Sequence, residues 1–470
     1  MTTHRQCDCR RVWNILAVAC CLACCLAAAA VEAAPRPPSV LVILSDDQRA
    51  DTIHALGNDA IRTPSLDALV ARGTVFDRAY CRGGMVPAIC VPSRAMLLSG
   101  RTLFRIDTHL DGCDTWPERF ERSGYRTFIT GKWHNGAAAV RRCFAEGDAV
   151  FLGGMHDQWS VPTESFRDHG EPVADERSRA HASERFGGAA ERFVERLGDE
   201  PFFAWVSFTA PHDPRQAPDR FRKRFDGHEP PVPANFLAEH PFDNGELTVR
   251  DETLLPRPRT RADVSHALAD YYACIEAMDD RIGRILAALE AKGRLADTIV
   301  LFTSDHGLAI GSHGLLGKQN LYEHSMRSPA ILAGPGVPAG KRCAALAYLF
   351  DLTATAGDLC GVEPPEGNEG RSLVPVLRGE KPGIRESLLL AYRDVQRAIV
   401  TPDWKLVDYP HAGRTQLFDL AADPAEMHDR SGDPAAAMRL ADLRTRLTEA
   451  RGEADDPLVT PRAPSTARHR

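Results

Sequence analysis

Four short apolar runs, each ending in polar residues, constrain this sequence more than any other feature. They occupy residues 40–44, 125–130, 202–208 and 298–303, and helical patterns of apolar residues separate them. A continuous apolar run of this length is typical of a strand buried on both faces of a parallel sheet. Strands that alternate with helices predict an α/β fold, with one large, mostly parallel sheet sandwiched by helices.

The clearest helical pattern lies just before the fourth run. Tyr271, Ile275, Met278, Ile282 and Leu289 share one face of a predicted helix, and a glycine at position 293 would end it. A polar segment at 154–179 is expected to be a loop over the site. His109, His156 and Trp159 are candidates for lining the substrate entrance.

The pattern changes near residue 375, where short strand-like runs separated by turn signals predict an antiparallel meander and a final amphipathic helix. We therefore expect a leader over 1–33, a catalytic domain over 38–375, a small C-terminal antiparallel-sheet subdomain with a helix over 376–455, and a flexible tail over 456–470.

The N-terminus has the features of a secretory signal. Arg5, Arg10 and Arg11 precede an apolar stretch, 12–31, that ends in small residues. We expect cleavage near Ala33 and a secreted or periplasmic protein without stable membrane insertion. The alternatives are a transmembrane anchor, which the alanine-rich second half of the stretch disfavours, and a lipoprotein, whose recognition sequence fits poorly here.

Charge and cysteine content exclude further classes. The 470 residues include 57 Lys and Arg against 64 Asp and Glu, a formal net charge of −7, whereas nucleic-acid-binding proteins normally carry a basic surplus. Seven cysteines follow the leader, without a CxxC pair that would indicate a zinc cluster. Export permits up to three disulfides, or none, and the odd number leaves at least one cysteine without an intrachain partner.

Each apolar run is followed by residues of catalytic type. Asp46 and Asp47 follow the first run, Lys132 and His134 the second, His212 the third, and Asp305 and His306 the fourth. Because ligands of open α/β sheets bind at the carboxyl ends of the strands, these side chains could converge on one place. The carboxylates offer the oxygen ligands that Ca²⁺ or Mg²⁺ prefers. The basic residues, with Lys318, suit a tetrahedral oxyanion.

The segment 90–101 predicts a helix end that favours anions. Pro92 suits a first helical turn, residues 93–99 can form the helix, and Gly100 can end it. Cys90 would then lie just ahead of the N-terminus, where unpaired backbone N–H groups attract negative charge. A buried or disulfide-bonded structural cysteine is the alternative interpretation.

This segment, C-V-P-S-R-A-M-L-L-S-G-R, resembles the signature of the type I sulfatases, in which the cysteine is oxidised to Cα-formylglycine during export. S-D-D-Q, G-K-W-H, A-P-H, S-D-H-G, G-K-Q-N-L-Y-E and, at 417–426, L-F-D-L-x-x-D-P-x-E resemble the same family in the expected order. The resemblance covers nearly the whole chain from residue 38 to the last helix. It implies the alkaline-phosphatase-like α/β fold with a small C-terminal subdomain.

The resemblance also implies roles for the matching residues. The expected ligands of one Ca²⁺ are Asp46, Asp47, Asp305, His306 and the modified side chain of Cys90, although many relatives have Asn where His306 stands. Arg94 and Lys132 are expected to position the formylglycine hydrate, and His134 to act as the base that helps to expel sulfate. His212 and Lys318 are expected to contact sulfate, and one of them to protonate the leaving alcohol.

Together these patterns predict a secreted, Ca²⁺-dependent sulfuric ester hydrolase that releases inorganic sulfate and an alcohol. Its partners would be a sulfated small molecule or glycan and the formylglycine-generating enzyme that modifies Cys90. A carbohydrate sulfate is the better candidate, because no aromatic cage for choline is readable. Two alternatives stay open: a phosphate or phosphonate ester hydrolase, which would usually need a second metal, and a non-catalytic protein that binds sulfated glycans.

Overall fold

Ten strands form one large sheet in the computed structural model, which describes residues 36–173 and 180–459. The first thirteen strands among the described residues are β1 (Ser39–Ser45), β2 (Gly73–Phe76), β3 (Ala79–Tyr80), β4 (Gly83–Gly84), β5 (Arg126–Lys132), β6 (Glu146–Phe151), β7 (Glu164–Arg167), β8 (Glu171–Val173), β9 (Phe202–Ser207), β10 (Thr298–Ser304), β11 (Ala330–Ala333), β12 (Lys341–Cys343) and β13 (Ala347–Tyr348). The large sheet has the order β12-β2-β11-β10-β1-β9-β5-β6-β7-β8. Its centre, from β10 to β6, is parallel, and antiparallel pairs lie toward both edges.

The four apolar runs form the four central strands β1, β5, β9 and β10, as predicted. All seven residues of β1 are buried. Because successive side chains of a strand point to opposite faces, Val40 and Val42 enter one hydrophobic core and Leu41 and Ile43 enter the other. The sheet is therefore covered on both faces, which is why its central strands read as continuous apolar runs.

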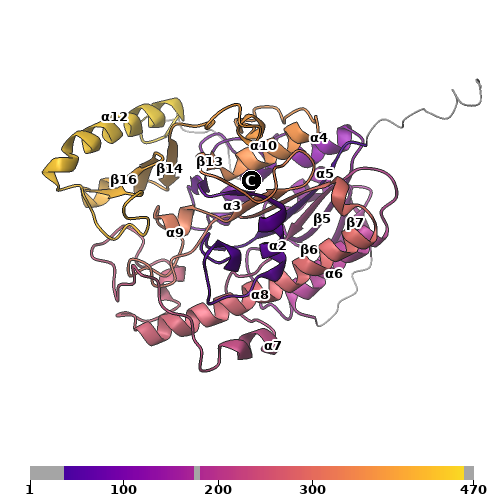
Figure 1. Ribbon diagram of the computed structural model, residues 1–470, viewed down its shortest axis with the longest axis horizontal. Coiled ribbons are helices and arrows are strands. Elements are labelled where there is room, and N and C mark those ends of the chain that lie inside the picture. Colours follow the sequence, from indigo (N-terminus) through magenta and orange to yellow (C-terminus); the bar gives the residue numbers. More distant parts are fainter. Residues whose placement is uncertain (1–35, 174–179, 460–470) are drawn as a thin grey trace, which may run out of the picture. The chain divides into compact units, whose positions relative to one another are not determined.

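Helices cover the two faces of the sheet, which confirms the predicted fold class. One core contains residues of α2 (Pro64–Arg72), α6 (Ala182–Glu195) and α8 (Arg261–Ala291), and the other contains residues of α3 (Cys90–Ser99), α4 (Trp116–Arg122), α5 (Ala137–Cys143) and α10 (Leu349–Leu359). Figure 1 shows α6 and α8 on one side of the strands and α4 and α10 on the other. Three one-turn helices are α7 (Asp219–Arg222), α9 (Glu323–Met326) and α11 (Val374–Leu377).

The second sheet is the predicted antiparallel meander, followed by the predicted helix. It comprises β14 (Leu388–Tyr392), β15 (Gln396–Val400), β16 (Trp404–Tyr409) and β17 (Arg414–Asp419), and α12 (Ala437–Glu453) lies beside it in Figure 1. The sequence did not indicate its fifth strand. The two-residue β4 pairs in parallel with β14 and so joins the meander to a segment near the N-terminus.

Several local expectations are wrong. The segment predicted as a loop at 154–179 contains β7 and β8, because Phe166 packs into the core. Helix α3 begins at Cys90 itself rather than after it. Asp456, assigned to the flexible tail, is buried in an ion pair with Arg397. The sequence left open whether any disulfide forms, and the seven cysteines of the described chain are all free.

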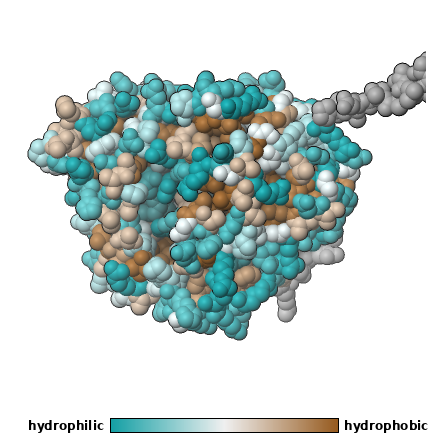
Figure 2. All heavy atoms as spheres, in the orientation of Figure 1, coloured by the Kyte–Doolittle hydropathy of each residue, from teal (hydrophilic) through white to brown (hydrophobic). Residues whose placement is uncertain are grey.

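The leader predicted at 1–33 lies outside the described residues, as do residues 174–179 and 460–470. None of the described helices combines the length and the apolar composition needed to cross a bilayer. Hydrophilic residues predominate on the face shown in Figure 2, with hydrophobic residues gathered in patches.

Gly83 provides a test of the junction between the two sheets. Its φ is +100°, and a Cβ atom there would lie 2.0 Å from the carbonyl oxygen of Ala391 in β14. We expect Gly83→Ala to lower the free energy of unfolding by at least about 2 kcal/mol, because it combines backbone strain with a backbone clash. The midpoint of denaturant unfolding measures this change.

Gly432→Ala is the matched control, since a Cβ at this position meets no atom within 4 Å. An unchanged midpoint in Gly83→Ala would show that the pairing of β4 with β14 adds little to stability.

Candidate active site

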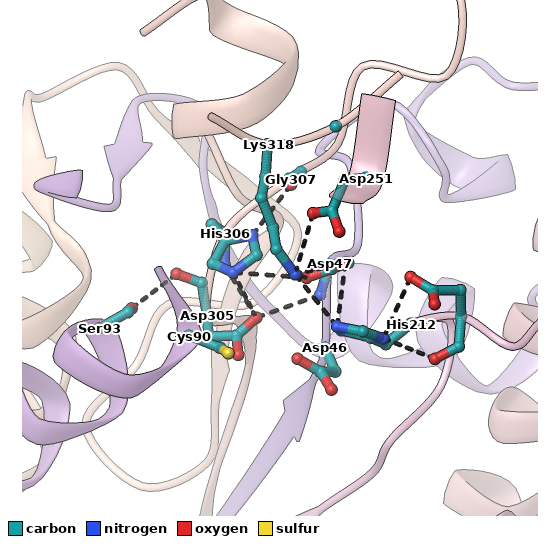
Figure 3. A network of polar contacts seen from close by, with 12 residues as sticks. Asp46, Asp47, Cys90, Ser93, His212, Asp251, Asp305, His306, Gly307 and Lys318 are labelled. Carbon is teal, nitrogen blue, oxygen red and sulfur yellow. Dashed lines mark hydrogen bonds and ion pairs between the residues drawn. The ribbon is translucent and has the colours of Figure 1, made fainter. Parts of the chain in front are cut away.

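The structure brings all ten predicted site residues together at the carboxyl edge of the large sheet. Strand register explains part of this convergence: Ser45 pairs with Ser304 and Leu44 with Ser207, so the residues that follow each strand emerge side by side. Asp47 donates its backbone N–H to Asp305 Oδ1 at 3.1 Å. Figure 3 shows the side chains from these strand ends turned toward one another.

Three buried carboxylates are each paired with a cation from another segment. Lys132 Nζ donates to Asp46 Oδ2 at 2.6 Å, and Lys318 Nζ lies 3.0 Å from both carboxylate oxygens of Asp47. Arg94 Nε donates to Asp305 at 3.0 Å, and its Nη2 lies 3.5 Å from Asp46. Burial alone would raise the pKa of Asp46, but Lys132, His212 and Arg94 hold it below its ordinary value. The Asp46 carboxylate therefore stays ionised.

His306 presents an unpaired nitrogen to these carboxylates. Its Nδ1 lies 3.0 Å from the carbonyl oxygen of Gly307, which can only accept a hydrogen bond, so Nδ1 carries a proton. Its Nε2 is buried without a hydrogen-bond partner, 3.4 Å from Asp47 Oδ1 and 3.9 Å from Asp305 Oδ1. Burial lowers the pKa of His306, but Asp305 and Asp47 raise it to about 9. With this pKa, Nε2 also carries a proton at neutral pH, and a dication bound beside Nε2 would displace it.

Cys90 lies against this group of charges. It is the first residue of the ten-residue helix α3, and its Sγ lies 3.3 Å from His134 Nδ1. Burial raises the pKa of the thiol, but Lys132, His134 and His306 bring it well below the ordinary value. Ligand atoms of Cys90, Asp305 and His306 lie within 4.8 Å of one another.

His212 and Lys318 form the other flank. His212 Nε2 lies 3.1 Å from Lys318 Nζ and 3.8 Å from Asp47 Oδ2. The opposite ring nitrogen, Nδ1, lies 2.7 Å from the carbonyl oxygen of Asp213. Nδ1 therefore donates its proton to this carbonyl, and Nε2 faces the cluster of charges. Figure 3 shows the His212 ring beside Lys318 and Asp47.

Sequence reasoning missed several residues that support the site. Asp213 forms ion pairs with His212 and Arg250, and Asp251 lies 3.9 Å from Lys318 Nζ. Ser207, the last residue of β9, accepts a hydrogen bond from Arg94. The position of Asp213 directly after His212 was a usable signal, whereas Arg250 and Asp251 stand in a short 3-10 helix, Arg250–Thr253, that no recognisable sequence pattern marks.

Other candidate residues do not join the cluster. Of the proposed entrance residues, His109, His156 and Trp159 are exposed, and the ring of His156 packs against Phe151.

Arg94 provides a test of the charge balance. We expect Arg94→Met to lower the free energy of unfolding by about 3 kcal/mol, because it leaves buried carboxylates without a partner. Denaturant unfolding measures the change. Arg444→Met is the control, since Arg444 is exposed on α12 and forms one long hydrogen bond, to Thr415. Equal effects of the two substitutions would contradict the analysis.

Comparison with known proteins identifies this arrangement. The chain matches the family model "Sulfatase" over residues 38–362 and the model "N-sulphoglucosamine sulphohydrolase, C-terminal" over residues 311–453. It is 26% identical to an N-acetylglucosamine-6-O-sulfatase of Bacteroides thetaiotaomicron, over 89% of this chain and 87% of the relative. It is 27% identical to a choline-sulfatase of Rhizobium meliloti, over 86% and 85%.

Solved structures show the same fold. A protein in complex with its substrate D-glucosamine-2-N,6-O-disulfate has a TM-score of 0.75 and 24% identity, over 90% of this chain and 99% of that one. A phosphonate monoester hydrolase of Agrobacterium radiobacter has a TM-score of 0.70 and 24% identity, over 89% and 96%. With the sulfatase model matching well over half of its length, the chain belongs to the sulfatase family and is a sulfuric ester hydrolase with the alkaline-phosphatase-like fold.

Proposed function

We propose that the protein hydrolyses sulfate esters of a carbohydrate, using a single Ca²⁺ and a formylglycine made from Cys90. The observation that carries this proposal is one buried cluster in which three carboxylates, an unpaired imidazole nitrogen, three cations and Cys90 lie together. The residues fit each of the two groups that the family implies, as argued next.

The donor set suits one hard dication. Asp46, Asp47 and Asp305 have carboxylate oxygens within 4.8 Å of one another, and His306 adds its unpaired Nε2. Oxygen-rich sets of this kind favour Ca²⁺ over zinc. The three carboxylates are balanced by Arg94, Lys132 and Lys318, so a bound dication leaves the site with a positive excess. That excess would attract an anionic sulfate ester and stabilise charge as sulfate leaves.

Residue 90 occupies the position expected for a nucleophile. When converted to formylglycine, it would supply, as an aldehyde hydrate, two hydroxyls on one carbon, one to attack sulfur and one to help release sulfate. His134 Nδ1, 3.3 Å from the side-chain atom of residue 90, is within reach to take a proton from it. The position of residue 90 at the start of α3 also favours negative charge.

The remaining residues hold the ester and move a second proton. Arg94 and Lys132 fix the carboxylates of Asp305 and Asp46 and so keep the ligand oxygens in place. Lys318 Nζ and His212 Nε2, 3.1 Å apart on the opposite flank, are placed to bind sulfate oxygens. One of these two groups would give a proton to the departing alcohol.

The names of similar proteins support a carbohydrate substrate. They include the N-acetylglucosamine-6-O-sulfatase and a Formosa agariphila ulvan-active sulfatase, 26% identical over 90% of this chain and 82% of the relative. The choline-sulfatase is equally similar, but choline recognition needs an aromatic cage, which the sequence does not offer. We therefore propose a sulfated glycan or sulfated sugar as the substrate.

A phosphate or phosphonate ester is the second candidate, because the phosphonate monoester hydrolase shares the fold. Asp47, His212 and Asp213 could form a second ligand group, which the sequence alone did not suggest. Lys318 Nζ, however, lies 3.0 Å from Asp47 and 3.1 Å from His212, and Arg250 pairs with Asp213. A second metal would have to displace these cations, so a single-metal sulfatase is favoured.

The proposal includes maturation during export. The leader at 1–33 would take the chain to the periplasm or the exterior, and a formylglycine-generating enzyme would modify Cys90 before residues 38–375 fold as the catalytic domain and 376–455 as the subdomain. The burial of Cys90, which is 2% exposed, supports this order, since the folded chain would hide it from a modifying enzyme.

Mass spectrometry tests the nucleophile. We expect the peptide that carries residue 90 to contain an aldehyde in place of the thiol in active protein. Cys90→Ala should lower kcat/KM for an aryl sulfate and for sulfated saccharides by at least about 10³-fold, since covalent catalysis is lost. Cys360→Ala, which changes another free cysteine, should keep full activity.

Active protein with an intact thiol at residue 90 would overturn the mechanism. Faster turnover of an aryl phosphate than of every sulfate ester in the panel would favour the phosphatase alternative.

Thermal unfolding tests the metal site. Ca²⁺ at about 100 times its Kd should stabilise the protein by about 2.7 kcal/mol, and chelation should reverse the gain. His306→Ala should shift the dependence to higher Ca²⁺ concentrations, whereas His428→Ala, at an exposed histidine, should not. A response to Ca²⁺ that is the same in both variants would exclude His306 as a ligand.

A further inference from the structure

A large cleft lies away from the residues of the active site. It has a volume of about 1350 Å³ and is lined by Thr74 of β2, by β12, by residues between 376 and 389, and by the C-terminal end of α12. None of the ten active-site residues lines it. The chemistry of the active site therefore does not account for this cleft.

The cleft is strongly basic although the chain is acidic. Its lining contains eight basic residues, Arg78, Arg82, Arg105, Lys341, Arg342, Arg371, Lys381 and Arg385, but only three acidic ones, Glu369, Glu386 and Glu453. Three of the cations are paired with carboxylates: Arg105 with Glu369, Arg342 with Asp77 and Arg385 with Asp351. The other five form no ion pair with any described residue. Because the whole chain carries −7, this concentration of positive charge is local.

Arg82 is the most unusual of these five. Its side chain is buried, with the residue 6% exposed, and its guanidinium lies 5.4 Å from the ring centre of Tyr348 and 5.9 Å from that of Phe104. Its Nε is buried without a hydrogen-bond partner, and no carboxylate of the described chain forms an ion pair with it. A buried charge without a counter-ion is costly unless something supplies one.

Two neighbouring arginines show what Arg82 lacks. Each of them stacks on one of the two rings that Arg82 contacts. Arg385 lies 4.8 Å from the ring centre of Tyr348, and Arg397 lies 5.6 Å from that of Phe104. Arg385 is bound to Asp351 at 2.6 Å, and Arg397 to the buried Asp456 at 2.7 Å. Arg82 has the same aromatic surroundings but no acid, and it opens onto the cleft.

We infer that this cleft binds a sulfated saccharide, with one anionic group on Arg82 and others on the unpaired cations of the walls. A single small anion would leave most of a cleft of this size empty, whereas an oligosaccharide that carries several sulfates matches both the volume and the spread of charge. The class of ligand rests on the proposed carbohydrate substrate. The cleft would hold one part of a sulfated glycan at a place separate from the site of hydrolysis.

Binding of a heparin-derived oligosaccharide, measured by calorimetry at several salt concentrations, tests the inference. Lys341→Gln combined with Lys381→Gln should weaken binding about fivefold and reduce its salt dependence, because exposed ion pairs are individually weak and are screened by salt. Arg82→Met should weaken binding by at least about tenfold, as expected when one partner of a buried charge pair is removed. The desulfated oligosaccharide should bind weakly to every variant.

Lys223→Gln combined with Lys292→Gln is the matched control, since it removes the same charge from exposed lysines outside the cleft. Equal losses in the two double variants would reduce the effect to net charge and overturn the inference, as would unchanged binding in the cleft variants. The lysine pair keeps the test valid if Arg82→Met fails to fold.

Aryl sulfate turnover separates this inference from the proposed function. All cleft variants should hydrolyse the small substrate with unchanged kcat/KM, because none alters an active-site residue. If the wild-type protein binds the sulfated saccharide but does not hydrolyse an aryl sulfate, the proposed function is contradicted and the inference is not. Wild-type protein that binds an acidic peptide in preference to the sulfated saccharide, with that binding weakened in the cleft variants, would identify a protein partner instead and overturn the inference.

Discussion

The repulsion among three buried carboxylates is the constraint that organises this structure. Asp46, Asp47 and Asp305 are almost fully buried, at 0%, 1% and 0% exposure, and uncompensated charges in such a place would destabilise the fold by several kcal/mol. The chain offsets them with a cation for each: Arg94 from α3, Lys132 from β5 and Lys318 from a loop after β10. Segments far apart in the sequence are thus held together by the same charges that the proposed chemistry would use.

The parallel sheet makes this concentration of charge possible. Strands that run in the same direction end at the same edge, and the in-register pairing of β1 with β10 puts Asp46 and Asp305 next to each other without a further turn. The strand ends alone provide too few cations to pair with the three carboxylates. Helix α3 and the loop around Lys318 therefore extend over the edge of the sheet and supply the others. That loop is almost entirely buried, which indicates a fixed part of the structure.

How much the sequence could predict depended on how local each signal was. The four central strands and the residues directly after them were readable, because burial on both faces leaves a continuous apolar run and the catalytic residue types follow at once. Strand β4 was not, since two glycines carry no periodicity. Arg250 and Asp251 were missed because their position depends on a long irregular segment, and the unpaired state of Arg82 is visible only when its neighbours are known.

The small sheet belongs to the site as much as the large one does. Through β4 it fixes the chain just before α3, where Gly84 lies so close to Pro92 that a Cβ would be 3.1 Å from its ring. Gln396 of β15 donates to the carbonyl of Gln319 and accepts from the N–H of Leu321, which clamps the loop that carries Lys318.

A buried ion-pair group completes this frame. Lys405 of β16 binds Glu323 at 3.0 Å and Glu426 at 2.9 Å, and Glu426 also accepts the backbone N–H of Glu323. The family-like motif of the subdomain, at 417–426, therefore has a physical reason: its last residue, Glu426, secures α9, the continuation of the Lys318 loop. In the proposed mechanism residue 90 and Lys318 lie on opposite sides of a bound sulfate, so the small sheet, which holds neither of them, would help to fix the distance between the nucleophile and the leaving-group contact.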